Sequence, residues 1–160
     1  MGFLTTVDES SQAQADTGTA TAVYISPDKL AGSIHGIKYA ELQGADFTTA
    51  LTTGDGKQYL HIPPALNGMN LVYAHAEVIT AGTTGTLDIQ IANVTDGVDM
   101  LSTKLTVDSG ETGSDTAATP VVINASNDDV ATNDLLRVDI DAIPTTAPQG
   151  LIVTLGFQLP

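Results

Sequence analysis

The stretch GLIVTLGFQLP, from Gly150 to Pro160, decides the fold. Large apolar side chains occupy every second position of it. This period of two predicts a β-strand with one buried face. The side chains expected on that face are Leu151, Val153, Leu155, Phe157 and Leu159. We therefore expect this strand to run through the middle of a β-sandwich.

The segment before it, LLRVDIDAI at residues 135–143, has the same period. Apolar side chains expected inside alternate there with charged side chains expected outside: Leu136, Val138 and Ile140 against Arg137, Asp139 and Asp141. Both segments have a strong apolar face, which places them near the centre of a sheet. Because only PTTAPQG separates them, we expect the two strands to pair with each other.

The rest of the chain from residue 31 predicts further short strands, about eight in all, with turn signals every 8–12 residues. NLVYAHAEVITAG, residues 70–82, is the longest of them. It is expected to place Val72, Ala74, Ala76 and Val78 on one face and Leu71, Tyr73, His75 and Glu77 on the other. The predicted fold is an all-β antiparallel sandwich of the jelly-roll type over residues 31–160. Residues 1–30, rich in Ser, Thr, Ala and Gln, are expected to form an extended N-terminal arm.

Charge and composition limit the function. The 160 residues include 5 basic and 19 acidic side chains, a net charge of -14. Such a chain is repelled by phosphate backbones and by anionic lipid, so neither nucleic acid nor a membrane is an expected partner. Since it has no cysteine, disulfides, thiolate metal sites and a cysteine nucleophile are excluded.

Two triplets resemble the catalytic motif of aspartic proteases, Asp16-Thr17-Gly18 and Asp108-Ser109-Gly110. Two such aspartates would have to share one proton. The first triplet lies in the polar arm, where no strand would hold it rigidly. Asp, Ser, Thr and Gly are also ordinary turn residues, which is the simpler interpretation. The sequence contains no nucleophile elbow and no phosphate-binding glycine loop, and we predict that the protein is not an enzyme.

Metal binding has two candidate locations. His61 and His75 lie on predicted strands and, if they are neighbours across a sheet, could hold zinc with Glu77. Their spacing matches no metal motif, and exposed strand histidines are the simpler interpretation. Calcium is the alternative in three acidic loops, at Asp96 with Asp99, Glu111 with Asp115, and Asn127-Asp128-Asp129. The same acidic residues are also typical of solvated turns, which is the simpler interpretation, and no cofactor is predicted.

Two longer segments of the sequence resemble a known protein family. They are IPPALNGMNLVYAHAEVITAGTTGTLDIQIANVTDGVDMLSTKLTVDSGET and NDLLRVDIDAIPTTAPQGLIVTLGFQLP. Over roughly residues 56–160 the chain resembles the jelly-roll domains of virion structural proteins of tailed bacteriophages. The resemblance implies a homotrimer assembled in the host cytoplasm. It also implies a place on the capsid surface, as a decoration or cement protein that binds the major capsid protein and bridges capsomers.

The same resemblance leaves an alternative, a receptor-binding or tail- or head-fibre module that recognises a host-surface glycan. The loops at 108–120 and 125–134 would then form the contact face. A third possibility is a non-viral carbohydrate-binding module with calcium in a loop. Four tyrosines and no tryptophan offer few aromatic platforms for sugar.

Tyrosines are the candidate interface anchors, because tyrosine tolerates a contact that is half wet. Ordinary core or rim packing is the other interpretation of the same residues. The short apolar patch around Tyr24 could also complete the sheet edge of a neighbouring subunit. The full set of interface candidates is Val23, Tyr24, Ile25, Tyr39, Tyr59 and Tyr73.

Overall fold

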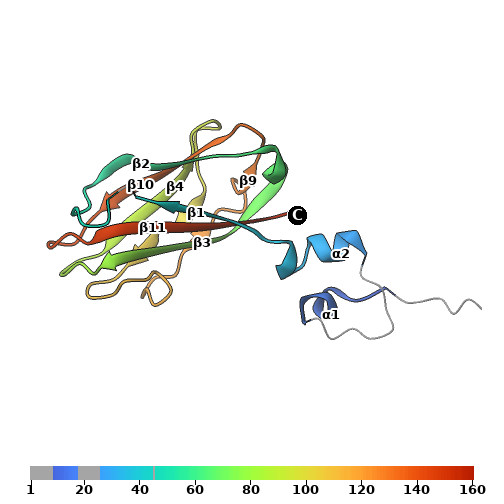
Figure 1. Ribbon diagram of the computed structural model, residues 1–160, viewed down its shortest axis with the longest axis horizontal. Coiled ribbons are helices and arrows are strands. Elements are labelled where there is room, and N and C mark those ends of the chain that lie inside the picture. The colour runs from blue at the N-terminus through green and yellow to red at the C-terminus, as the bar shows by residue number, and fades with distance from the viewer. Residues whose placement is uncertain (1–8, 18–25, 45) are drawn as a thin grey trace, which may run out of the picture.

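The computed structural model describes residues 9–17, 26–44 and 46–160. Two antiparallel sheets face each other and enclose one hydrophobic core (Figure 1). The predicted all-β antiparallel sandwich is therefore confirmed.

The first sheet has the strand order β1 (Lys38–Gln43), β11 (Gln149–Gln158), β3 (Met69–Thr80) and β9 (Asp129–Val130). The second has the order β2 (Gly54–His61), β10 (Leu135–Ala142), β4 (Leu87–Asn93) and β5 (Val98–Asp99), and β7 (Leu105–Val107) also pairs with β4. A small separate sheet joins β6 (Leu101–Thr103) to β8 (Val122–Ile123). The helical elements are α1 (Gln12–Thr17), α2 (Pro27–Ala31) and the 3-10 turns η1 (Ile34–Gly36) and η2 (Pro64–Leu66).

The two apolar strands near the C-terminus lie in different sheets. β11 pairs with β1 and β3, whereas β10 pairs with β2 and β4. Both are inner strands as predicted, but the prediction that they pair with each other was wrong. The connection between them is held by the loop after β3, because Thr83 and Thr146 exchange backbone hydrogen bonds of 3.1 and 3.2 Å. It therefore crosses from one sheet to the other instead of closing a hairpin.

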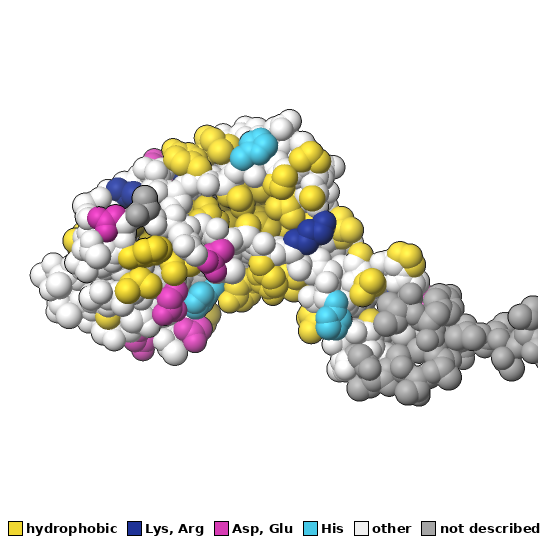
Figure 2. Space-filling view, in the orientation of Figure 1, with side chains coloured by type: hydrophobic (Ala, Val, Ile, Leu, Met, Phe, Trp, Pro, Cys, Tyr) yellow, Lys and Arg dark blue, Asp and Glu magenta, His cyan; other side chains and the backbone are white. Residues whose placement is uncertain are grey.

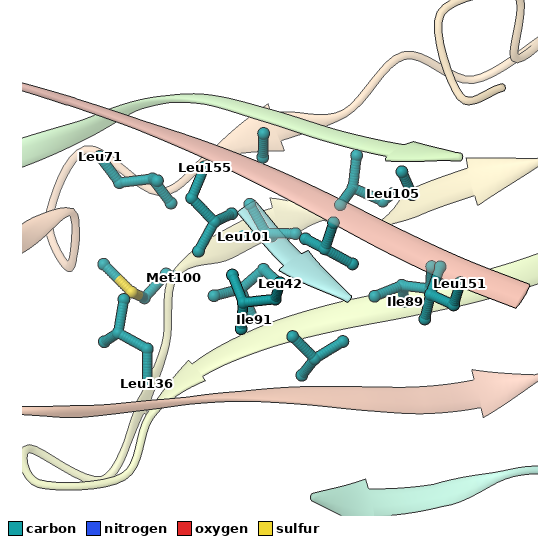
Figure 3. Close-up of a cluster of buried hydrophobic side chains, with 14 of the residues drawn as sticks. Leu42, Leu71, Ile89, Ile91, Met100, Leu101, Leu105, Leu136, Leu151 and Leu155 are labelled. Carbon is teal, nitrogen blue, oxygen red and sulfur yellow. The ribbon is translucent and has the colours of Figure 1, made fainter. Parts of the chain in front are cut away.

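The buried face of β11 forms one wall of the core. Leu151, Val153, Leu155 and Phe157 are almost completely buried. They pack in one cluster with inward side chains of β4 and β10, among them Ile89, Ile91 and Leu136 (Figure 3). Leu159, predicted in the same row, is 42% exposed because β11 ends at Gln158.

β3 carries a register shift that the alternation did not predict. Gly156 lies opposite Tyr73 and Phe157 lies opposite Leu71, so Val72 is an extra residue on β3. A β-bulge of this kind reverses the faces on one side of it. Leu71 is consequently buried and Val72 is exposed, the opposite of the prediction, whereas Ala74, Ala76 and Val78 are inside as predicted.

The described part of residues 1–30 is helical where the sequence predicts an extended arm. Ser11 and Gln14 form a reciprocal capping box at α1: the Gln14 N–H donates to Ser11 Oγ at 3.3 Å and the Ser11 N–H donates to Gln14 Oε1 at 2.9 Å. Pro27 begins α2, where its missing N–H costs nothing. Figure 1 shows α1 and α2 beyond the end of the sandwich.

Replacing Leu155 with Asp tests the central position of β11. Because Leu155 is 0% exposed, the carboxylate would be buried without a partner, and we expect a loss of at least about 4 kcal/mol in unfolding free energy. Thermal unfolding followed by circular dichroism checks this. The control is Thr154→Asp on the outer face of the same strand, opposite Glu41, with an expected cost of about 1 kcal/mol or less. Equal melting curves for the Leu155→Asp variant and the wild type would contradict the assignment.

Candidate functional site

Two tyrosines meet on the outer face of the first sheet. Tyr39 of β1 and Tyr73 of β3 lie on either side of Gly156 in β11. Their ring centroids are 5.7 Å apart at an interplanar angle of 83°, an edge-to-face pair. The side chains are 60% and 42% exposed, so the pair forms a surface feature rather than part of the core.

Gly156 makes this pair possible. A Cβ atom at that position would come within 2.9 Å of Tyr39 Cε1 and 2.9 Å of Tyr73 Cβ. Any side chain at Gly156 would therefore push the two tyrosines apart.

His75 extends the aromatic row along β3. Its ring is stacked on Tyr73 at a centroid distance of 6.4 Å and an angle of 24°. Nδ1 lies 3.2 Å from Ser114 Oγ, and Nε2 lies 3.4 Å from Glu77 Oε2. Both ring nitrogens thus have oxygen neighbours, which fix the orientation of the ring.

The segment that carries Ser114 closes the edge of β3. The Val78 N–H donates to Thr112 O at 2.7 Å, and the Ser114 N–H donates to Ala76 O at 3.0 Å. Ser114 Oγ also accepts from the Ala76 N–H at 3.0 Å. These bonds hold the loop after β7 rigidly against the strand.

A pocket of about 320 Å³ lies between the aromatic row and this loop. Its polar lining includes Asp115, whose carboxylate forms no hydrogen bond or ion pair within the described part of the chain. The full lining is Val72, Tyr73, Ala74, His75, Ser114, Asp115, Pro120, Val121 and Ile123. The pocket is thus mainly apolar, with a few polar groups, as small-molecule sites usually are.

A second hollow, which we call the β1–β2 groove, lies where the two sheets part. It has a volume of about 530 Å³ and is lined by residues 41–44 of β1 and its end and 57–60 of β2. Within the described ranges β1 is paired only with β11, and β2 only with β10. The groove therefore has two free strand edges and includes the apolar side chains Leu42 and Leu60. Figure 2 shows apolar side chains at the surface on this side of the molecule.

Gln58 spans the mouth of this groove. Its Nε2 donates to Leu151 O of the opposite sheet at 3.0 Å. Its Oε1 is buried and has no hydrogen-bond partner. A buried acceptor without a donor is unfavourable, so an incoming N–H would stabilise this position.

The structure separates the other predicted site residues. Val23, Tyr24 and Ile25 lie outside the described residues. Tyr59 is 55% exposed on β2 of the second sheet, opposite Arg137, and does not join the Tyr39–Tyr73 pair. Exposure excludes core packing for Tyr39, Tyr59 and Tyr73, and their role as interface anchors stays a prediction.

Arg137, which lies opposite Tyr59 in the neighbouring strand, contacts two carboxylates. Its Nη2 and Nε contact Asp139 at 2.7 and 3.0 Å, and Nη2 also lies 3.2 Å from Asp55. The hydrogen bond to Asp139 raises the pKa of Arg137 above its usual value. Asp139 itself is 4% exposed and accepts from the Gly56 N–H at 2.8 Å, so this cluster ties β10 to β2 and has no free group for chemistry.

The predicted zinc and protease constellations are not assembled. His61 lies on β2 and His75 on β3, in different sheets, so the condition for a shared zinc site, that they are neighbours across a sheet, is not met. Asp16 accepts from the Ile34 N–H at 3.2 Å beside α1, whereas Asp108 accepts from the Ala118 N–H at 2.8 Å after β7. Each carboxylate thus serves local structure.

In two of the acidic loops one carboxylate accepts a local hydrogen bond. Asp96 accepts from Asn93 Nδ2 at 2.8 Å, and Glu111 accepts from Thr116 Oγ1. In the described ranges no three His, Cys, Asp or Glu side chains are grouped so that they could hold a metal ion. No helix within those ranges has the length and apolar character needed to span a membrane.

Sequence reasoning missed the residues that build the pocket. Gly156 comes near Tyr73 through the register of β11 against β3, whereas Ser114 and Asp115 are brought there by the hydrogen bonds between their loop and the edge of β3. Alternation along the strand did indicate that Tyr73, His75 and Glu77 share a face.

Comparisons of the chain with protein-family models, with curated proteins and with solved structures found no match in any of the three. The likeness to phage virion proteins therefore stays a prediction.

Replacing Gly156 with Ala tests the aromatic row. We expect a loss of about 1–3 kcal/mol in unfolding free energy, because the new methyl group meets both tyrosines. In a Tyr39→Ala background the same change should cost measurably less, since one of the two obstacles is gone. Urea unfolding of the four proteins of this cycle measures the difference. Identical costs in the two backgrounds would contradict the packing described here.

Proposed function

We propose that this chain is a structural subunit of a tailed-phage virion, a homotrimeric decoration protein that binds the major capsid protein on the capsid surface. The orders β1-β11-β3-β9 and β2-β10-β4-β5 support the jelly-roll part of the proposal. The strands β1 to β4 alternate between the two sheets, and β10 and β11 lie in different sheets, as expected when connections cross from one layer of a sandwich to the other.

The β1–β2 groove carries the proposal. Within the described residues, an isolated subunit leaves two strand edges and the Gln58 Oε1 acceptor without partners. Free edges of this kind favour association with another chain. A second subunit that covers the groove would bury apolar surface and supply donors to the edges.

The position of the groove is compatible with the proposed ring of three subunits. It lies at one side of the sandwich, so a contact between this side and a different surface of the neighbour is heterologous and closes into a ring. Tyr59 lies on the groove, and Tyr39 belongs to the strand that borders it. Both are exposed and suited to a half-wet contact.

The N-terminal helical segment supplies the proposed attachment to the major capsid protein. α1 and α2 are joined by hydrogen bonds such as Gln12 Nε2 to Lys29 O at 3.1 Å, and they lie beyond the end of the sandwich (Figure 1). Leu30 and Ile34 present apolar side chains there that are 50% and 60% exposed. These side chains offer apolar area to a capsid subunit, while the net charge of -14 keeps neighbouring virions apart.

The oligomeric state tests the first half of the proposal. Native mass spectrometry of the full chain should show a trimer. Tyr59→Glu, which places a charge on the groove, should shift the population to monomer by at least about tenfold in the association constant. Val94→Glu is the matched control, because Val94 is exposed just after β4, which β10 separates from β2, and the change should leave the trimer intact. A monomeric wild type at micromolar concentration would contradict the proposal.

Removal of residues 1–30 tests the second half. The truncated protein should keep its sandwich and its trimer, but its affinity for empty capsids should fall by at least about tenfold, because the apolar area of this segment is lost. Sedimentation with capsids measures occupancy. Full occupancy by the truncated protein would show that attachment uses another surface.

A further inference from the structure

We propose that the pocket beside Tyr73 binds a neutral saccharide. This site is independent of the proposed assembly, because β3 and the loop after β7 lie on the far side of β11 from the β1–β2 groove. The pocket would remain open in a trimer held together through that groove.

The shape of the pocket fits a ligand with one apolar face. Tyr73 lines one side, and its orientation is fixed by the edge contact with Tyr39 and the stacked ring of His75. Pro120, Val121 and Ile123 line the other side. A volume of about 320 Å³ is at the lower end of the range for small-molecule sites, so the ligand is small. The apolar face of a pyranose ring can pack against such surfaces.

The exposed Asp115 carboxylate at the pocket favours a ligand that donates hydrogen bonds. The Asp115 carboxylate is an acceptor without a partner in the described residues. Its Oδ1 lies over Gly113, where a Cβ atom would be only 2.5 Å away, and Glu77 Oε2 lies beside the same position at 2.9 Å. The absence of a side chain at Gly113 therefore lets the Asp115 carboxylate lie close against the backbone of its own loop. Sugar hydroxyls are donors of the right kind, since hydrogen bonds to a charged acceptor are strong.

A peptide is a poorer occupant than a saccharide. A peptide strand binds by adding its backbone to a free sheet edge. The edge of β3 beside the pocket is already occupied, because Ala76 and Val78 bond to Ser114 and Thr112. The edge at Ala76 and Val78 is therefore closed to an extended peptide.

Anionic ligands are disfavoured by charge. Asp115 lines the pocket, Glu77 lies beside the neighbouring Gly113, and the chain carries a net charge of -14. Sialylated or sulfated sugars would therefore be repelled, which leaves neutral sugars as the ligand class.

The test uses the full chain and a panel of soluble neutral oligosaccharides of glucose, galactose, mannose and N-acetylglucosamine. Binding is measured by isothermal titration calorimetry and located by backbone NMR shifts. We expect at least one neutral oligosaccharide to bind, with shifts at residues 72–75 and 114–121. Asp115→Asn and Tyr73→Ser should each weaken binding at least about tenfold, the change expected for loss of a charged hydrogen bond or an aromatic contact. Asp129→Asn and Val94→Ser, at exposed residues outside both the pocket and the β1–β2 groove, are the controls and should leave affinity unchanged.

Four results would overturn the proposal. They are no binding by any neutral oligosaccharide of the panel, tighter binding of sialylated or sulfated sugars, tighter binding of an alkylammonium salt, and shifts confined to the loop at 125–134. Unchanged affinity in both pocket variants would overturn it as well. Melting temperatures of all variants, expected within a few degrees of wild type, separate loss of the ligand from loss of the fold.

Discussion

The rest of the structure depends on the buried face of β11. This strand is hydrogen-bonded on both sides, to β1 and to β3, and its four buried side chains face the inner strands of the second sheet. Apolar burial of this kind is the main favourable term in folding. Because the side chains of a strand alternate, the same register that buries Leu155 also fixes which residues of β11 and its neighbours reach the surface.

The surface features follow from that register. Gly156 lies between Tyr39 and Tyr73 because β11 pairs with β1 on one side and with β3 on the other. The bulge at Val72 is the point where the register of β3 against β11 shifts by one residue. The pocket beside Tyr73 and the β1–β2 groove lie on opposite sides of β11. One surface can therefore serve assembly while the other remains accessible to a ligand.

The alternation of apolar and polar residues predicted where the strands lie, but it did not predict which strands pair with each other. Alternation in residues 135–143 and 151–159 identified two inner strands, but pairing depends on the loops that Thr83 and Thr146 join, which are distant in sequence. The bulge at Val72 has no local signature in the sequence and reversed two side chains. The helix at Gln12–Thr17 was predictable from the Ser11-x-x-Gln14 capping pattern. The pocket was not predictable from the sequence, because Tyr73, Asp115 and Gly156 are far apart along the chain and come near one another only in the folded sheet.

The central claim is that the free edge of β1 is covered in the assembled protein. The Gly44 N–H donates to Leu151 O, so alternation along the ladder leaves the amides of Tyr39, Glu41 and Gln43 on the free edge. Amide hydrogen exchange of these three residues, measured across protein concentration, tests the claim most directly. The account predicts fast exchange in dilute protein and strong protection once subunits associate. Fast exchange at every concentration, while the amides of β11 stay protected, would contradict it.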